Sequence, residues 1–178
     1  MSLVEKIFKN LKRLIMKNKN FMLNPSNSTP SRESSKRFYP PSITPHEHEP
    51  TRDKFDIIQR DAFGEGVVSK IKFQAADLLF RFSGTPLPYQ TLYTLQKQRG
   101  LYIEDPYFMG KILHSCDPNT FVNMETQEFW AIKDIFPGDF ITMDYEATED
   151  ELYRSFECTC GSQKCRKRIK GKEKGGKG

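Results

Sequence analysis

The sequence HSCDPN at His114–Asn119 contains the only cysteine of the 178-residue chain that lies outside its C-terminal cysteine cluster. That cluster, Cys158-x-Cys160-x4-Cys165, places three thiols within eight residues. Structural zinc is tetrahedral and takes four ligands, so the cluster alone leaves one position to fill. The sequence therefore predicts one structural zinc ion bound by Cys116, Cys158, Cys160 and Cys165. The alternative is a three-ligand site with a free thiol at Cys116.

The composition favours an intracellular protein with unstructured parts. Hydrophobic residues make up 37% of the chain, below the share typical of globular domains, so we expect part of it to be unstructured. No apolar run is long enough to cross a bilayer, and the N-terminus lacks the pattern of a secretory signal. We therefore expect a soluble protein, cytoplasmic or nuclear and chromatin-associated, that is not secreted. Cysteines stay reduced in that environment, which favours metal binding over disulfides.

Charge is distributed unevenly along the chain, although the formal net charge is only +5. Residues 1–20 contain six Lys or Arg against one Glu, and residues 164–178 contain eight against one. The segment between them therefore has a net charge of −7. An acidic body suits a cationic peptide better than nucleic acid. The basic ends are suited to non-specific contacts with nucleic acid or anionic surfaces.

The same patterns divide the chain into five segments. Residues 1–20 are predicted to form a basic amphipathic helix, which is either a docking helix or a solvated extension. Residues 21–52 are rich in Ser and Pro and are predicted to be a disordered linker. The folded body is predicted over 53–150. A cysteine-bearing segment over 151–171 and a mobile Lys/Gly tail over 172–178 follow it.

Most of the body has the pattern of short strands, which predicts a mainly β (α+β) fold. The predicted strands span residues 55–58, 67–71, 77–82, 121–124, 129–132 and 140–143. Of these, 121–124 and 129–132 are expected to pair as a hairpin. The spacing of apolar residues over 89–98, with Pro88 before them and Gly100 after them, predicts a helix. Residues 110–115 are predicted to form a buried strand or turn.

Four motifs follow one another along the body. They are Gly64-Glu65-Gly66, the segment HSCDPN, Asp144-Tyr145 after a Pro-Gly turn, and the three clustered cysteines. Together they resemble a SET domain with a post-SET segment, without the cysteine cluster of a pre-SET segment. The resemblance covers about two-thirds of the chain, from Lys54 to Gly171.

The resemblance has consequences for fold and activity. It implies a β-clip-like fold of small twisted sheets, in which the segment carrying Tyr145 is threaded under the loop of His114. It implies transfer of a methyl group from S-adenosylmethionine to the side-chain nitrogen of a protein lysine. It also implies that Cys116 joins the three post-SET cysteines on zinc.

The resemblance assigns the catalytic role to Tyr145. Its phenol is expected to orient the lysine amine by a hydrogen bond and to exclude water, whereas a core tyrosine at a strand end is the alternative. Tyr102 is expected to line the lysine channel. Met143 stands where the family often has Phe or Tyr, and a thioether cannot hold a water molecule against the amine. This residue therefore makes di- or trimethylation possible.

The resemblance also implies a cofactor site that includes Tyr145. Gly64 and Gly66, with Glu65 between them, are expected to let the backbone approach the methionine part of S-adenosylmethionine. His114 is expected to lie by the adenine, mostly through its backbone. Phe156 is expected to cover the adenine.

Two positions of this site depart from the family pattern. Leu113 stands where the family has an Asn that contacts the amino-acid end of the cofactor. Gly110 stands where it usually has an Arg. These departures motivate an alternative function, a catalytically weak SET-like, zinc-bound module for protein interaction.

The leading function is protein-lysine methylation. Its expected partner is a protein or peptide that presents a lysine in a basic context, such as a histone-like tail or a ribosomal protein. A third hypothesis, nucleic-acid binding through the basic ends, rests on charge alone.

Overall fold

The computed structural model describes residues 36–60 and 64–172. The predicted helix over 1–20, the first part of the predicted linker and the tail after Lys172 lie outside these residues. Within the described residues, no helix is long and apolar enough to cross a membrane.

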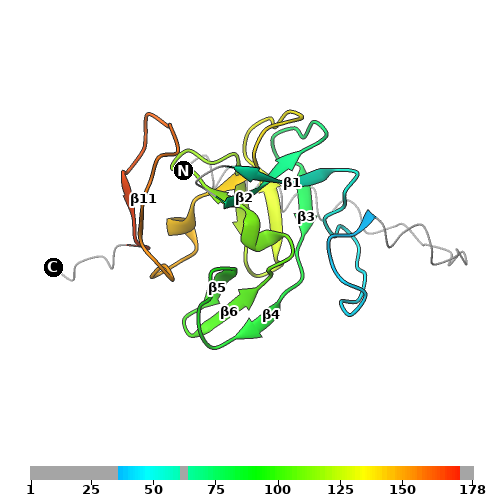
Figure 1. Cartoon of the computed structure of the whole chain (residues 1–178), viewed down its shortest axis with the longest axis horizontal. Helices are drawn as coiled ribbons and strands as arrows, with labels where there is room; N and C mark the ends of the chain where they lie inside the picture. The colour runs from blue at the N-terminus through cyan, green and yellow to red at the C-terminus, as the bar shows by residue number, and fades with distance from the viewer. Residues whose placement is uncertain (1–35, 61–63, 173–178) are drawn as a thin grey trace, which may run out of the picture. The chain divides into compact units, whose positions relative to one another are not determined.

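Short strands dominate the described residues (Figure 1). In chain order the strands are β1 (Phe55–Arg60), β2 (Gly64–Ser69), β3 (Leu78–Arg81), β4 (Thr85–Leu87), β5 (Thr94–Gln98), β6 (Leu101–Glu104), β7 (Leu113–His114), β8 (Thr120–Asn123), β9 (Glu128–Ala131), β10 (Thr142–Met143), β11 (Phe156–Glu157) and β12 (Arg168–Ile169). The 3₁₀ helices η3 (Met109–Lys111) and η4 (Tyr145–Ala147) lie just before β7 and just after β10. The expected mainly β class is confirmed.

The strands pair into small sheets. These are β1 with β2, β3–β9–β8, β4–β6–β5, β10 with β7, and β11 with β12. The hairpin predicted from the sequence is the antiparallel pair of β8 and β9. The pair of β10 with β7 is parallel. Figure 1 shows the sheet of β4, β5 and β6 on one side of β1 and β2, and the segment that carries β11 on another.

A cluster of phenylalanines forms the centre of the core. Phe80 of β3 and Phe129 of β9 are register partners, and their ring centroids stack 4.7 Å apart. Phe55 and Phe108 meet Phe80 edge-on, at 5.5 and 4.9 Å between centroids. Aromatic pairs in such geometries contribute about 0.5–1.5 kcal/mol beyond their burial. The cluster therefore joins β1, β3 and β9 to the turn that leads into η3.

The predicted helix over 89–98 is wrong. Residues 94–98 form β5, which pairs with β6, and the residues before them form bends and a turn. Thr91 and Thr94 account for the difference, because their hydroxyls compete with helical hydrogen bonds. The Thr91 hydroxyl accepts the N–H of Tyr93 at 3.1 Å, and the Thr94 hydroxyl accepts the N–H of Thr91 at 3.0 Å.

Residues 36–52 differ from the disordered linker that the sequence predicted. The compact unit begins with this segment, and Phe38 and Tyr39 belong to its core. Arg37 and Glu49 form an ion pair across the segment, with only 12% and 10% of their side chains exposed. Two adjacent aromatic residues therefore order a stretch whose Ser and Pro content favoured disorder. The folded body starts earlier than the predicted boundary at residue 53.

The Tyr39 hydroxyl lies at the centre of a buried network. It donates to Asp105 Oδ2 at 2.8 Å and accepts the N–H of Ser83 at 3.1 Å. The Asp105 carboxylate also accepts the backbone N–H groups of residues 107–109. Burial raises the pKa of Tyr39 and the pKa of Asp105. The network fixes the turn that leads into η3.

Replacing Tyr39 with Phe is expected to destabilise the fold. The change removes a donor from the buried Asp105 carboxyl and leaves the Ser83 N–H without its acceptor, and such a loss costs about 1–3 kcal/mol. Urea unfolding followed by circular dichroism measures the effect. Tyr89→Phe, at an exposed position, is the control. Equal unfolding midpoints for the two variants would show that the network does not stabilise the fold.

Candidate functional site

Strands β7 and β10 bring together two segments that are far apart in sequence. They pair in parallel, with His114 opposite Met143. Asn119 fastens the pair, because its amide nitrogen donates to the carbonyl oxygen of Phe140 at 2.8 Å and its oxygen accepts the N–H of Thr142 at 2.9 Å. The start of η4 therefore lies against the loop that carries HSCDPN.

Tyr145 is the first residue of η4. Its hydroxyl donates to the carbonyl oxygen of Ile112 at 2.7 Å, and its backbone N–H donates to His114 Nδ1 at 3.2 Å. Burial raises the pKa of Tyr145, and the nearby Glu149 carboxylate adds to this effect. The phenol therefore stays neutral at physiological pH, with a fixed direction for its proton.

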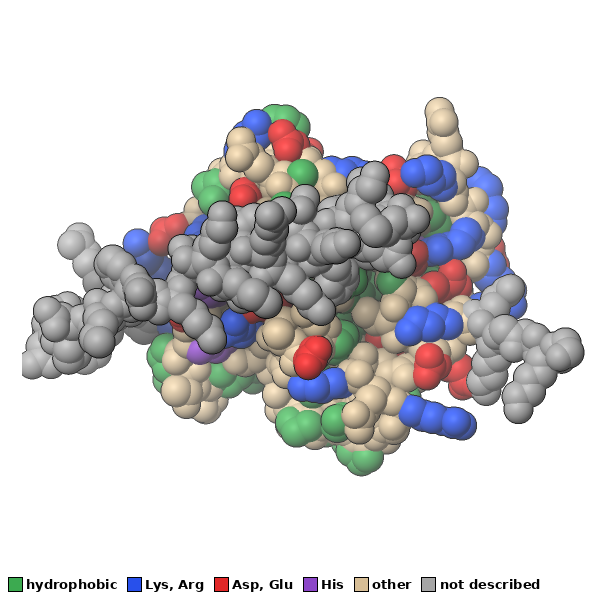
Figure 2. Space-filling model, turned by 180° about the vertical axis from the view of Figure 1, so that it is seen from behind, with side chains coloured by type: hydrophobic (Ala, Val, Ile, Leu, Met, Phe, Trp, Pro, Cys, Tyr) green, Lys and Arg blue, Asp and Glu red, His purple; other side chains and the backbone are tan. Residues whose placement is uncertain are grey.

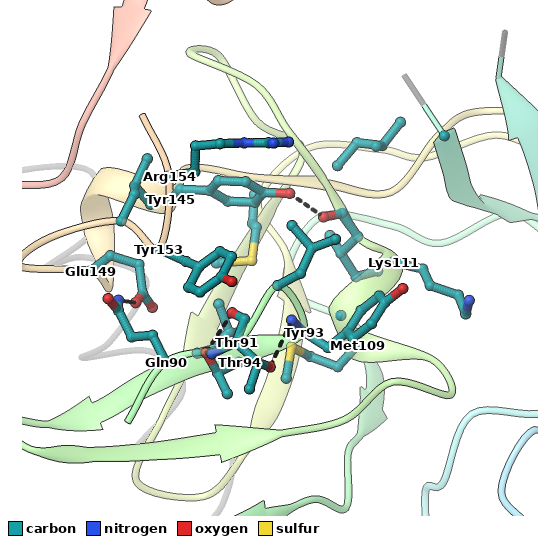
Figure 3. A pocket seen from close by; sticks show the side chains of 18 of the residues that line it. Gln90, Thr91, Tyr93, Thr94, Met109, Lys111, Tyr145, Glu149, Tyr153 and Arg154 are labelled. Atoms are coloured by element: carbon teal, nitrogen blue, oxygen red, sulfur yellow. Dashed lines mark hydrogen bonds between the residues drawn. The ribbon is translucent and has the colours of Figure 1, made fainter. Parts of the chain in front are cut away.

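A cavity of about 490 Å³ lies in front of Tyr145 (Figure 3). Its walls come from the start of β2, the turn before β5, the segment from η3 to β7, and the segment from η4 to β11. Figure 3 shows the side chains of Tyr93, Lys111, Glu149 and Tyr153 around the same space. The walls thus combine aromatic rings with both signs of charge.

The cavity contains part of the predicted site. The predicted residues that line it are Gly64, Glu65, Leu113, Tyr145 and Phe156. The predicted residues outside the lining are Gly66, His114 and Tyr102.

The four cysteines form one cluster. The sulfur atoms of Cys116, Cys158, Cys160 and Cys165 all lie within 4.8 Å of one another, and those of Cys116 and Cys158 are 3.8 Å apart. Four thiolates about 2.3 Å from a tetrahedral zinc ion lie about 3.8 Å from each other, so the cluster fits one such ion.

The pKa values of two thiols in the cluster, Cys158 and Cys160, are shifted in opposite directions. Burial raises the pKa of the Cys158 thiol. Burial acts in the same direction on Cys160, but the backbone N–H groups of Cys116 and Ser162 outweigh it and lower the pKa of that thiol. At least one member of the cluster is thus prepared to act as a thiolate ligand.

No family model matches the sequence. Methyltransferase flvH of Aspergillus flavus is 35% identical over 82 residues, which cover 45% of this chain and 46% of that protein. Histone-lysine N-methyltransferase 2B of Homo sapiens is 22% identical over 147 residues, which cover 68% of this chain and 5% of that protein. The chain therefore spans less than half the length of these curated relatives.

Solved structures share the arrangement of the strands. The crystal structure of KRYPTONITE in complex with mCHG DNA and SAH matches with a TM-score of 0.55 and 23% identity, over 64% of this chain and 28% of that chain. The methyltransferase domain of human Histone-lysine N-methyltransferase SETMAR matches with a TM-score of 0.53 and 15% identity, over 66% of this chain and 58% of that chain. This chain has a SET-domain fold. Its four-cysteine cluster is consistent with the zinc site of a post-SET segment.

Gly66 lies outside the cavity lining, at a close packing contact in this SET domain. A Cβ atom at this position would lie 2.8 Å from Leu113 Cδ1 and 2.8 Å from Phe140 Cε1. A side chain at this position would have to displace Leu113 and the Phe140 ring, so glycine suits the close packing of β2 against β7 and the residues before β10. Gly64 lines the cavity with a positive φ of 78°, and a Cβ atom there would have no neighbour within 4 Å. The backbone at Gly64 is therefore open to the cavity, whereas the backbone at Gly66 is covered by packing.

His114 lies between the cysteine cluster and Tyr145. Its Nδ1 accepts the Tyr145 N–H, so in the neutral ring Nε2 carries the proton and points it toward Cys116 Sγ, 3.3 Å away. The imidazole centroid lies 5.2 Å from the Tyr145 ring and 5.7 Å from the Phe156 ring. Burial lowers the pKa of His114, which favours the neutral ring. The imidazole therefore packs against two residues of the cavity wall, Tyr145 and Phe156.

Tyr102 lies outside the lining of this cavity. Strand β6 sets it opposite Leu87 of β4 and Gln96 of β5, outside the cavity lining. Tyr93, in the turn before β5, lines the cavity (Figure 3). Sequence reasoning missed Tyr93 because it assigned this turn to a helix. The threonines on either side of Tyr93 were the signal for the turn.

Glu149 is a second lining residue that the sequence did not single out. Its Oε1 accepts the N–H of Gln96 at 2.7 Å, and its Oε2 accepts the side-chain amide of Gln90 at 3.2 Å. Burial raises the pKa of Glu149. The carboxyl therefore fastens the residues after η4 to the sheet of β5. No pattern in the local sequence identifies partners that lie so far upstream.

Ion pairs hold the post-SET segment against the body. Arg166 Nη1 lies 2.9 Å from Asp144 Oδ2, and Arg166 Nε lies 3.0 Å from Glu146 Oε2. Lys164 Nζ lies 3.1 Å from Asp117 Oδ1. Figure 2 shows basic and acidic side chains intermixed along the edge of the molecule at its right. The segment is thus positioned by charge pairing as well as by its cysteines.

Replacing Cys160 with Ser is expected to reduce the zinc content below one ion per chain. A tetrahedral site that loses one thiolate binds zinc less tightly, and residues 154–172 should then exchange amide hydrogens faster. Native mass spectrometry and hydrogen exchange measure the two effects. Ser162→Ala keeps all four cysteines and should retain one zinc ion. Equal zinc content in both variants would exclude Cys160 as a ligand.

Proposed function

We propose that this SET domain transfers a methyl group from S-adenosylmethionine to the side-chain nitrogen of a protein lysine, with one structural zinc ion in the post-SET segment. The observation that carries the proposal is the cavity, which Tyr145 and Phe156 line and which the four-cysteine cluster adjoins through His114. The SET-domain fold supports it, as does the SAH bound to KRYPTONITE in a structure of the same fold.

The residues of the cavity suit a reaction that needs positioning and little covalent chemistry. S-adenosylmethionine, when bound, supplies an activated methyl group on a sulfonium. The Tyr145 hydroxyl donates to the Ile112 carbonyl, so its lone pairs can accept a hydrogen bond from a lysine amine. This contact would orient a neutral lysine amine in the cavity. The donor would supply its methyl group to that nitrogen with S-adenosylhomocysteine as the leaving group, and the proton of the methylated ammonium would pass to solvent.

The charge of the chain supports a basic protein as substrate. The segment between the basic ends has a net charge of −7, so its surface is acidic on balance. A lysine flanked by basic residues is complementary to such a surface. A KRYPTONITE structure with the same fold contains an H3(1-15) peptide, which supports a peptide substrate here.

The first test is cofactor binding followed by methyl transfer. Isothermal titration with S-adenosylhomocysteine is expected to show binding, and labelled S-adenosylmethionine is expected to mark lysines in a proteome extract.

Tyr145→Phe should lower the turnover rate by about 10²-fold, because an oriented hydrogen bond to the reacting nitrogen is lost, while the cofactor still binds. Tyr89→Phe, at an exposed position outside the cavity lining, should leave turnover unchanged. An equal loss in both variants would contradict the role of Tyr145.

The alternative, a zinc-bound interaction module without turnover, is favoured by one observation. A Cβ at Gly110 would lie 2.6 Å from the carbonyl oxygen of Asp105 and 2.7 Å from Tyr93 Cβ, so this position cannot carry the Arg that the resemblance expects. If S-adenosylhomocysteine gave neither heat nor a thermal shift, the module would be the better interpretation.

Met143 leads to a prediction about the product. Its side chain is buried and lines the cavity, and it offers no hydroxyl to hold water near the amine. We expect di- or trimethyllysine under exhaustive turnover, detected by mass spectrometry of the methylated protein. Met143→Tyr should shift the product toward monomethyllysine. A wild-type product that stops at one methyl group would contradict this prediction.

A further inference from the structure

We propose that a second, basic cavity, on the post-SET segment, binds the phosphate backbone of nucleic acid. The described residues that line this cavity of about 690 Å³ are Glu146, Arg166, Arg168, Lys170, Gly171 and Lys172. No described residue lines both this cavity and the one in front of Tyr145. The inference does not depend on methyl transfer, and it gives the basic C-terminal end of the chain a defined binding surface.

The cations of the basic cavity come from a stretch of sequence without acidic residues. Residues 164–172 contain six Lys or Arg and no Asp or Glu. The stretch includes β12, in which Ile169 is fully buried. Burial alternates from there on, with positions 169 and 171 buried and positions 168, 170 and 172 exposed. Such alternation is typical of an extended chain that packs on one side. The three exposed cations therefore share the outer face.

Gly171 holds the end of this stretch close to the body. It has a positive φ of 113°, and a Cβ atom there would lie 2.5 Å from the carbonyl oxygen of Asp150. Next to it, the carbonyl oxygen of Lys170 accepts the N–H of Leu152 at 3.2 Å. The backbone is thus fastened to the residues that follow η4, which leaves the basic side chains on the solvent side.

The lining of the basic cavity has a net charge of +3, from four cations and one acid. The acid, Glu146, is already paired, because its Oε2 lies 3.0 Å from Arg166 Nε and its Oε1 accepts the N–H of Lys170 at 3.1 Å. Arg166 also donates to Asp144, which lies outside the lining. Arg166 is therefore part of the fold, and the remaining positive charge is at positions 168, 170 and 172.

Arg168 and Lys172 have contacts that a phosphate can share. Arg168 Nη1 lies 3.5 Å from Glu157 Oε1, but the two side chains are 66% and 71% exposed, and ion pairs at such surfaces are weak. Lys172 Nζ donates to the carbonyl oxygen of Thr148 at 3.3 Å, which leaves further protons of the ammonium for a ligand. The guanidinium of Arg168 offers a fork of donors that fits phosphate oxygens. An anion can thus bind here without unpairing a buried charge.

The spread of the cations favours a polyanion over a single anion. An extended chain spans at most about 14 Å from residue 168 to residue 172. A nucleic-acid strand in a duplex advances about 3.4 Å per nucleotide, so about four successive phosphates fit this length. A surface that binds membranes usually combines cations with apolar side chains, and no large apolar residue is among the described residues of the lining. These features favour nucleic acid as the ligand.

Fluorescence anisotropy with a short labelled DNA duplex and the full chain tests the inference. Replacing both Arg168 and Lys172 with Gln is expected to weaken binding about 10-fold at low salt. The slope of log affinity against log salt concentration should fall by about two, because each lost phosphate contact releases fewer counterions. Arg168→Lys retains the charge and should retain the slope.

The matched control replaces both Lys97 and Arg99 with Gln. These two residues are exposed and lie outside the basic cavity, and the change removes the same amount of charge. Affinity and salt slope should both stay close to those of the wild type. Unchanged thermal midpoints and zinc content verify that each variant keeps the fold and the cysteine cluster.

Three outcomes would overturn the inference. The first is equal weakening by the two double variants, which would show that only net charge matters, or no weakening by the cavity variant. The second is binding of a polyglutamate peptide or of anionic phospholipid vesicles as tightly as the duplex, with the same loss in the cavity variant, which would assign the cavity to that partner. The third is a wild-type chain that shows no salt-dependent binding to the duplex.

Discussion

Asn119 binds backbone groups on both sides of the start of β10, and this contact holds β10 parallel to β7. The rest of the site depends on the pairing. It places Tyr145 against His114, and it places Cys116 where the post-SET cysteines can reach it. Polar groups in this region are satisfied by partners far away in sequence, so the arrangement forms as a unit.

A second buried network shapes the wall of the cavity that η3 contributes. The Tyr39 hydroxyl and the Asp105 carboxylate close the turn before η3, and they do so with a residue from the segment predicted to be a linker. Buried polar groups are costly when unpaired, so the network specifies one conformation of the turn. The N-terminal part of the folded body thus contributes to the site without touching the cavity.

In the methyl-transfer hypothesis, both networks position residues of the same cavity. The pairing of β7 with β10 brings the Tyr145 hydroxyl to the Ile112 carbonyl, and the turn before η3 brings Lys111 into the lining of the same cavity. The post-SET segment adds the wall that carries Phe156, held by charge pairs of Arg166 and by the cysteine cluster. Positioning is the main requirement of the proposed chemistry, and each wall is positioned by buried polar or ionic contacts.

The amino-acid sequence by itself determined the mainly β class, the hairpin of β8 and β9, and the set of four cysteines. These follow from local periodicity and from the ligand number of zinc, both of which can be counted along the chain. It also placed Tyr145 and Phe156 near one another through the resemblance.

The tertiary structure alone decided which residues face the cavity. Tyr93 lines the cavity and Tyr102 does not. Gly66 lies at a packing contact, and the segment around Tyr39 belongs to the core. The fold also joins Lys111 to Glu65. Most of these results depend on contacts between residues distant in sequence, whose burial and pairing override local propensity. The turn that holds Tyr93 is the exception, because Thr91 and Thr94 gave a local signal for it.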